Sequence, residues 1–173
     1  MEELFPLVNE QGDLIGKASR KLCHSGSFLL HPVVHLHVFN PTGQLFLQKR
    51  SLEKDIQPGM WDTSVGGHVD YDETLGNADW VLPALLREAR EELGIIGFSP
   101  VFVMRYLFRS AFECELVHTY YTVSDGSVVV DPVEISEGRF WDRSEILANL
   151  GKGVFTPNFE GEIVKVLEAF SAR

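Results

Sequence analysis

The most informative stretch of this chain reads Arg87-Glu88-Ala89-Arg90-Glu91-Glu92-Leu93-Gly94-Ile95. It forms the second half of a helix that we predict over Pro83 to Leu93, because proline suits a first helical turn and Gly94 suits the cap. The apolar residues of this helix recur at helical spacing and form one stripe: Leu82, Leu85, Leu86, Ala89 and Leu93. Because Glu88, Glu91 and Glu92 are spaced i, i+3 and i+4, we expect three carboxylates on the opposite face.

Carboxylates that crowd one helical face repel one another. Like charges at this spacing destabilise a helix by about 0.2–0.5 kcal/mol per pair. A hard divalent cation such as Mg²⁺ prefers carboxylate oxygens and would neutralise the cluster. The alternative is a solvated acidic face on which Arg87 pairs with Glu88 and Glu91. The spacing alone leaves both interpretations open.

The sequence outside this helix alternates between apolar and polar residues, as strands do. Val34, Leu36 and Val38 share one side of such a segment, and His35 and His37 share the other. We expect strands at 4–9, 14–18, 32–40, 44–50, 98–108, 115–123 and 138–141, a helical turn at 19–24, and helices at 144–150 and from Pro157 onward, with Thr156 as N-cap. Many strands around one strong central helix predict a mixed sheet between helices.

Composition narrows the class of protein. The 173 residues suit one domain, and 45% hydrophobic with 23% charged residues is ordinary for a globular chain. Fifteen Lys and Arg against 25 Asp and Glu give a net charge of −10, which argues against a nucleic-acid partner. Cys23 and Cys114 are too few for a disulfide framework or a cysteine zinc site. We find no signal peptide and no spanning segment, so we expect a cytoplasmic protein without a membrane partner.

A longer pattern surrounds the acidic helix. Gly67-x5-Glu73 followed by Arg87-Glu88-Ala89-x-Glu91-Glu92-x-Gly94-Ile95 resembles the signature of the Nudix hydrolases, Gly-x5-Glu-x7-Arg-Glu-apolar-x-Glu-Glu-x-Gly-apolar. The helical half matches throughout, whereas thirteen residues separate Glu73 from Arg87 where the family has seven. We interpret residues 76–81 as a six-residue insertion. The resemblance covers roughly 30–170 and implies one Nudix domain over 1–173, an α/β/α sandwich with a central mixed sheet.

The resemblance also implies an activity, the hydrolysis of a diphosphate linkage in a small substrate of the nucleoside diphosphate-X type. Glu88, Glu91 and Glu92 would hold Mg²⁺ or Mn²⁺, and Glu92 or Glu88 would be the general base. Arg87 would orient a carboxylate, and Gly67 would allow a tight loop against the helix. By similarity to one branch of the superfamily, the cations Arg50 and Lys54 would bind the diphosphate.

That branch is the type 1 isopentenyl-diphosphate isomerases. Five residues of this chain resemble the metal site of that branch and occur in the same order: His24, His31, His68, Glu113 and Glu115. Three imidazoles with carboxylates suit Zn, Mn or Fe better than Mg²⁺, so we expect a second metal site for Zn or Mn. His35, His37 and His118 fit no such pattern, and we assign them structural roles.

Two departures argue against isomerase chemistry. In that branch a cysteine supplies the acid and a tryptophan covers the carbocation, and here these positions hold Gly66 and Asn158. All three helix glutamates are present, which favours a hydrolase. The alternatives are an isopentenyl-diphosphate isomerase and a catalytically idle Nudix-like binding module. The sequence leaves open whether the protein forms a homodimer.

Overall fold

Two ten-residue strands, β3 (Leu30–Phe39) and β8 (Cys114–Val123), form the centre of the sheet. They run parallel, from the pair Leu30 and Cys114 to the pair Phe39 and Val123. Parallel neighbours need a long crossover, and here it contains the acidic helix α2 (Val81–Leu93). This computed structural model describes residues 2–54, 56–74, 79–133 and 135–173.

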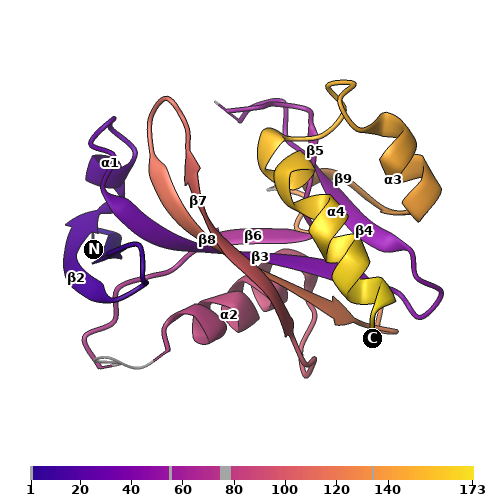
Figure 1. Cartoon of the computed structure of the whole chain (residues 1–173), viewed down its shortest axis with the longest axis horizontal. Coiled ribbons are helices and arrows are strands. Elements are labelled where there is room, and N and C mark those ends of the chain that lie inside the picture. The colour runs from indigo at the N-terminus through magenta and orange to yellow at the C-terminus, as the bar shows by residue number, and fades with distance from the viewer. Residues whose placement is uncertain (1, 55, 75–78, 134) are drawn as a thin grey trace.

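The other strands of the sheet join this pair in antiparallel fashion. β4 (Leu45–Arg50) and β6 (Val65–His68) pair with β3, β7 (Val101–Arg109) pairs with β8, and β5 (Trp61–Asp62) and β9 (Ile135–Trp141) pair with β4. A separate hairpin of β1 (Leu4–Val8) and β2 (Leu14–Ser19) leads into α1 (Arg20–Cys23), and the chain ends with α3 (Arg143–Asn149) and α4 (Pro157–Ser171). The sheet is therefore mixed (Figure 1).

The two faces of the sheet pack against different helices. Val34, Leu36 and Val38 of β3 form one core with four residues of α2: Ala84, Leu85, Ala89 and Leu93. The next residue, Phe39, points to the other face and joins a second core with four residues of α4: Phe159, Ile163, Val166 and Leu167. The α/β/α sandwich with a central mixed sheet is therefore confirmed (Figure 1).

Helix α2 starts two residues earlier than predicted. The Asp79 carboxylate accepts a hydrogen bond from the Val81 N–H at 3.0 Å, so this first turn is capped from outside the helix. Gly94 ends the helix at φ 66°, as predicted. Leu86 is 41% exposed and does not belong to the apolar stripe, because it lies about 100° around the axis from the fully buried Leu85.

Two short strands, β5 and β6, lie where no strand is predicted. Between them, buried Ser64 accepts a hydrogen bond from the Val38 N–H at 2.8 Å and donates one to the Phe46 carbonyl. These bonds turn the chain so that β6 can pair with β3 beside α2. The strands at the chain's other predicted positions differ only at their ends, and residues 76–78 of the predicted insertion lie outside the described residues.

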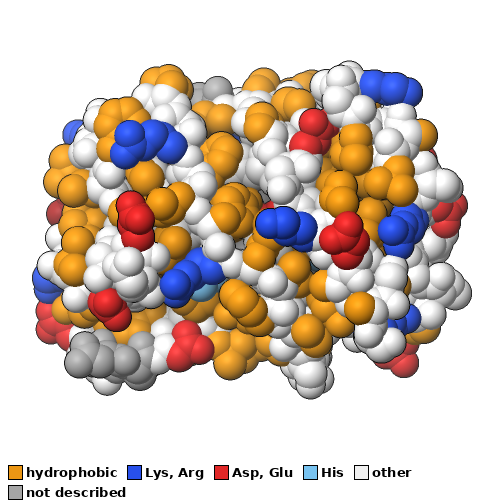
Figure 2. Space-filling view, viewed as in Figure 1, with side chains coloured by type: hydrophobic (Ala, Val, Ile, Leu, Met, Phe, Trp, Pro, Cys, Tyr) orange, Lys and Arg blue, Asp and Glu red, His pale blue; other side chains and the backbone are white. Residues whose placement is uncertain are grey.

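The surface carries both signs of charge. On the face shown in Figure 2, basic and acidic side chains are scattered among apolar ones rather than gathered in one patch. None of the helices in the described parts of the chain is both long and apolar enough to cross a bilayer.

Candidate active site

One cavity of about 670 Å³ brings the two predicted clusters together. Its wall contains the three glutamates of α2, four of the five residues of the predicted histidine and glutamate site, and both predicted diphosphate-binding cations: Glu88, Glu91, Glu92, His24, His68, Glu113, Glu115, Arg50 and Lys54. The fifth residue, His31, is completely buried behind them. Residues from every part of the chain thus meet in a single concave site.

Glu92 is the most enclosed of the helix carboxylates. Its Oε2 accepts hydrogen bonds from Gln48 Nε2 at 3.0 Å and from the Gly66 N–H at 3.4 Å. Burial nevertheless raises the pKa of Glu92 to about 8, and burial raises the pKa of Glu88 to about 7 against the opposing charge of Arg87. Burial disfavours two charged carboxylates here, and a divalent cation would offset that effect. The donor set therefore fits Mg²⁺ or Mn²⁺.

Gly67 permits the close approach of the helix to β6. A Cβ at this position would overlap the Glu88 carboxyl group, so any other residue would displace Glu88. The backbone of Gly67 is not in the left-handed region, and its role is therefore to leave space. This agrees with the tight loop that the sequence predicts.

Arg87 is held by a carboxylate that the sequence analysis missed. Its Nη1 lies 2.6 Å from Asp70 Oδ2, and its Nη2 donates to the His68 carbonyl at 3.0 Å and contacts Glu88 Oε1 at 3.0 Å. Glu73, the corresponding residue of the sequence signature, instead pairs with Lys17 at 2.7 Å on the surface.

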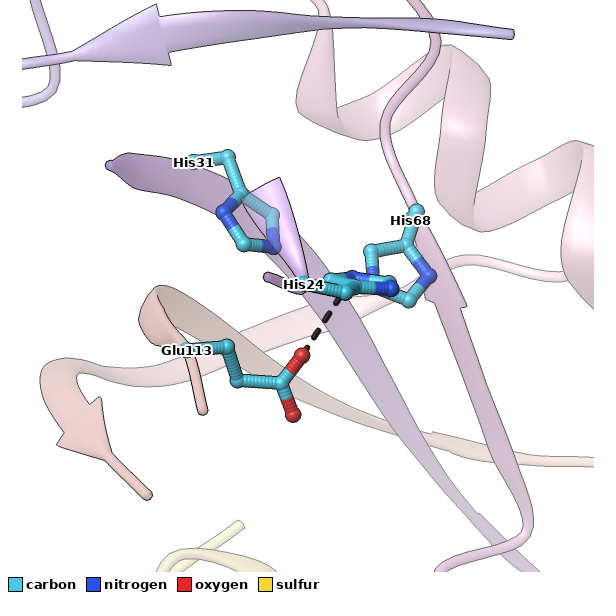
Figure 3. Close-up of side chains that lie close together, drawn as sticks. All are labelled: His24, His31, His68 and Glu113. Carbon is cyan, nitrogen blue, oxygen red and sulfur yellow. Dashed lines mark hydrogen bonds and ion pairs between the residues drawn. The ribbon is translucent and has the colours of Figure 1, made fainter. Parts of the chain in front are cut away.

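The histidine cluster adjoins the same cavity, whose wall includes His24, His68 and Glu113. His24, His31, His68 and Glu113 each offer one ligand atom, and these atoms lie within 4.8 Å of one another (Figure 3). His24 Nε2 lies 3.1 Å from His68 Nε2 and 3.2 Å from Glu113 Oε2. Glu115 Oε1 lies 3.8 Å from His68 Nε2, at the edge of the group.

The imidazoles of this cluster are in the form that binds metal. His31 Nδ1 must donate its hydrogen bond to the Leu29 carbonyl at 2.9 Å, because that oxygen can only accept. Its buried Nε2 has no partner among the described residues, so a lone pair points into the cluster. Burial lowers the pKa of His24 and of His31, and it lowers the pKa of His68 well below the usual value. Neutral rings with converging nitrogens fit a transition metal.

The remaining predicted residues lie at the cavity or behind it. Arg50 Nε donates to the Ile56 carbonyl at 3.1 Å, and its Nη1 lies 3.4 Å from Asp62 Oδ2. Gly66 and Asn158 line the cavity, so neither brings a thiol or an aromatic ring to it. His118 is buried outside the cavity and donates from Nδ1 to the Leu116 carbonyl at 3.1 Å.

Sequence reasoning also missed Glu162, which is completely buried on α4. Its carboxylate pairs with His35 Nδ1 at 3.0 Å and with His37 Nε2 at 2.8 Å. His35 and His37 were predicted to be structural, yet His35 lines the cavity. A single carboxylate 125 residues or more from its partners leaves no local signal in the sequence.

Comparisons with known proteins agree with this geometry. A family model described as NUDIX domain matches residues 29–159. The uncharacterized Nudix hydrolase YfcD of Escherichia coli (strain K12) is 32% identical over 157 residues, 90% of this chain and 82% of that protein. Isopentenyl-diphosphate Delta-isomerase 1 of Photorhabdus laumondii is 28% identical over 171 residues, 94% of this chain and 93% of that protein.

A solved structure has the same fold as this chain. The crystal structure of DR0079 from Deinococcus radiodurans superposes with a TM-score of 0.71 and 26% identity, covering 96% of this chain and 98% of that one. Sequence, fold and the acidic helix thus agree, and the chain belongs to the NUDIX family of pyrophosphohydrolases.

Proposed function

We propose that this protein hydrolyses a diphosphate linkage in a small molecule of the nucleoside diphosphate-X type, with Mg²⁺ or Mn²⁺ held by Glu88, Glu91 and Glu92. The observation that carries the proposal is the enclosure of two of these carboxylates, Glu88 and Glu92, at one wall of a cavity large enough for such a substrate.

The residues of the cavity would then have separate roles in the reaction. A bound divalent cation neutralises diphosphate charge and makes a nearby water more acidic. Gln48 and the Gly66 N–H fix Glu92, and Arg87 fixes Glu88, so that one of these carboxylates accepts the proton of the attacking water. Arg50, with Lys54, holds the phosphate that is not attacked, because a guanidinium fork matches phosphate oxygens.

For the histidine cluster we propose a second metal, Zn or Mn. His24, His31, His68 and Glu113 would bind it, and Glu115 would complete the site after a small movement. The converging neutral imidazoles support this assignment, because Mg²⁺ prefers oxygen ligands.

A second candidate is the isomerisation of isopentenyl diphosphate. The histidine cluster and the similarity to an isopentenyl-diphosphate isomerase favour it. Against it stand Gly66 and Asn158, because isomerisation needs a proton donor at the alkene and a π face for the cation. An idle binding module is disfavoured, since binding alone does not require three crowded carboxylates.

The test runs two assays on the same proteins. Wild type, Glu92→Gln and the control Glu168→Gln, an exposed residue of α4, are given a panel of nucleoside diphosphate compounds with Mg²⁺ or Mn²⁺. In parallel, isopentenyl diphosphate in D₂O is analysed for deuterium uptake. We expect hydrolysis by wild type, a loss of at least about 100-fold in Glu92→Gln, and no loss in Glu168→Gln.

The two assays separate the candidates. Activity of Glu92→Gln near that of wild type at saturating Mg²⁺ would remove the proposed mechanism. Clear deuterium uptake by wild type without phosphate release would replace the hydrolase with the isomerase. Neither activity over the whole panel would favour the binding module.

A further inference from the structure

His35 presents an unused donor to the cavity. The residue lies on β3, and its side chain is only 11% exposed, yet it lines the same cavity as the glutamates of α2. Its Nδ1 is bonded to Glu162, at 3.0 Å from Oε1 and 3.2 Å from Oε2. Its Nε2 makes no hydrogen bond to any residue that the structure describes. One ring nitrogen is therefore fixed from behind, and the other is free for a ligand.

Glu162 is built to fix this ring. Besides His35, its carboxylate accepts hydrogen bonds from His37 Nε2, Tyr106 OH and Thr119 Oγ1, each at 2.8 Å. Burial would raise the pKa of Glu162, but the two histidines hold that pKa well below its usual range. Burial alone would lower the pKa of His35, but the Glu162 carboxylate outweighs it and raises that pKa to about 9. The pair is therefore ionic at neutral pH, and Nε2 carries a proton.

Gly66 keeps this nitrogen uncovered. It pairs directly with His35 across β3 and β6, and a Cβ there would lie 3.6 Å from His35 Cδ2 and 3.8 Å from Nε2. Its backbone is not left-handed, so its conformation does not require glycine. The N–H of the same residue is bonded to Glu92 at 3.4 Å. His35 and the carboxylate cluster of α2 therefore border the same residue.

The charges of the cavity wall would repel an anionic ligand, and a positively charged donor would offset this repulsion. The wall is rich in carboxylates, including Glu3, Asp62 and the glutamates of α2, and a diphosphate is itself anionic. The cations Arg20 and Arg50 are paired with Glu3 at 3.0 Å and with Asp62 at 3.4 Å, both of which are part of the wall. Glu162, the partner of His35, is instead buried and is not part of the wall, so the positive charge of His35 faces the cavity.

We propose that His35 is a further substrate-binding residue of this hydrolase, which donates a hydrogen bond from Nε2 to a phosphate oxygen of the diphosphate while Glu162 positions the ring. The inference rests on the proposed function in that it takes a diphosphate as the ligand. Glu162 holds the His35 ring in place before the substrate binds. A donor positioned in this way stabilises the negative charge of the phosphate groups, and this charge is still present while the linkage breaks.

The experiment measures binding without turnover. Methylenediphosphonate, a diphosphate analogue that cannot be hydrolysed, is titrated with Mg²⁺ into wild type, His35→Gln and His37→Gln by calorimetry. His37 is the matched control, because it binds the same carboxylate but does not line the cavity. We expect the affinity to fall about 10- to 100-fold in His35→Gln, as for a lost charged hydrogen bond, and to stay near the wild-type value in His37→Gln.

A structural role would give a different result. Equal losses in the two variants, unchanged affinity in His35→Gln, or a wild type that does not bind the analogue would each overturn the inference. Should His35→Gln not fold, the double variant His35→Gln with Glu162→Gln removes both buried charges and serves in its place. Wild type that binds the analogue through His35 but hydrolyses nothing in the panel would remove the proposed function and keep this inference.

Discussion

The molecule contains two groups of histidines, one partly buried and one buried, and they are built in opposite ways. In the cluster of His24, His31 and His68, imidazole nitrogens face one another, and the nearest carboxylates lie at 3.2 and 3.8 Å. In the pair of His35 and His37, both rings are bonded to a completely buried carboxylate, Glu162. Burial lowers the pKa of all three rings in the first group, whereas Glu162 raises the pKa of His35 to about 9.

This contrast shows that the position of the carboxylate decides what a buried histidine does. Without a tightly bound carboxylate, the ring is neutral and its lone pair can bind a metal. With the buried carboxylate of Glu162 behind it, the ring of His35 is charged and its other nitrogen can donate to an anion. The two proposals therefore assign the same residue type to two different ligands, a metal ion for the first group and a phosphate oxygen for His35.

The largest expected effect concerns metal content. Protein prepared without a histidine tag should hold about one transition metal per chain. His68→Gln should lose that metal, because His68 contributes one of the converging nitrogens, whereas His35→Gln should keep it. Elemental analysis after dialysis gives the result. Metal retained by His68→Gln, or lost from His35→Gln, would contradict the assignment of the metal to the first group of histidines.

The next effect concerns stability. Glu162→Gln should lower the free energy of unfolding by about 3–5 kcal/mol, because it leaves an unpaired charged ring in the interior. Glu113→Gln, measured with a chelator present, should change it by only about 1 kcal/mol, because Glu113 faces the neutral ring of His24. Denaturant titrations followed by circular dichroism measure both values. Equal losses would mean that the two carboxylates play the same role.

The sequence revealed these two groups unequally. His24, His31 and His68 are ordered along the chain in a pattern that a known family repeats, and the acidic helix has a period that can be read directly. The partnership of His35 with Glu162 depends on α4 crossing the sheet over β3, which no local pattern encodes. The pairing of Arg87 with Asp70 was likewise not predicted, and Glu73 instead pairs with Lys17 on the surface.

The same reasoning applies to the fold. The core strands and α2 could be predicted because their apolar residues alternate or recur in helical spacing. The short strands β5 and β6 could not, since they have two and four residues and the turn between them is held by side-chain hydrogen bonds of Ser64 to β3 and β4. Local periodicity therefore predicts the layers, and long-range hydrogen bonds decide the details of the site.

The smallest effect is a difference in pH dependence. The raised pKa of His35 means that the folded protein keeps a proton up to about pH 9 that the unfolded chain releases near pH 6.5. The contribution of the pair is therefore complete below pH 6.5 and is lost as the pH rises through 9. In the first group, where burial lowers the pKa of His68, the sign is reversed, and stability is lost as the pH falls below 6.5.

Chelator-treated wild type and His35→Gln, compared by denaturant titration between pH 6.5 and 9.5, give the measurement. The stability difference between the two proteins should shrink steadily as the pH rises. Glu88 with a pKa of about 7 and Glu92 with a pKa of about 8 also titrate in this range, are present in both proteins and cancel in the difference. Burial raises the pKa of Glu115 to about 7 and the charge of His35 lowers it, so this group does not cancel, and the change in the difference is read between pH 8 and 9.5, where Glu115 is ionised in both proteins. Asp62 and Glu115 act on His35 in the same direction as Glu162 and remain in both. A difference that does not change with pH would show that the ring of His35 is neutral, and the contrast between the two groups would then be one of geometry alone.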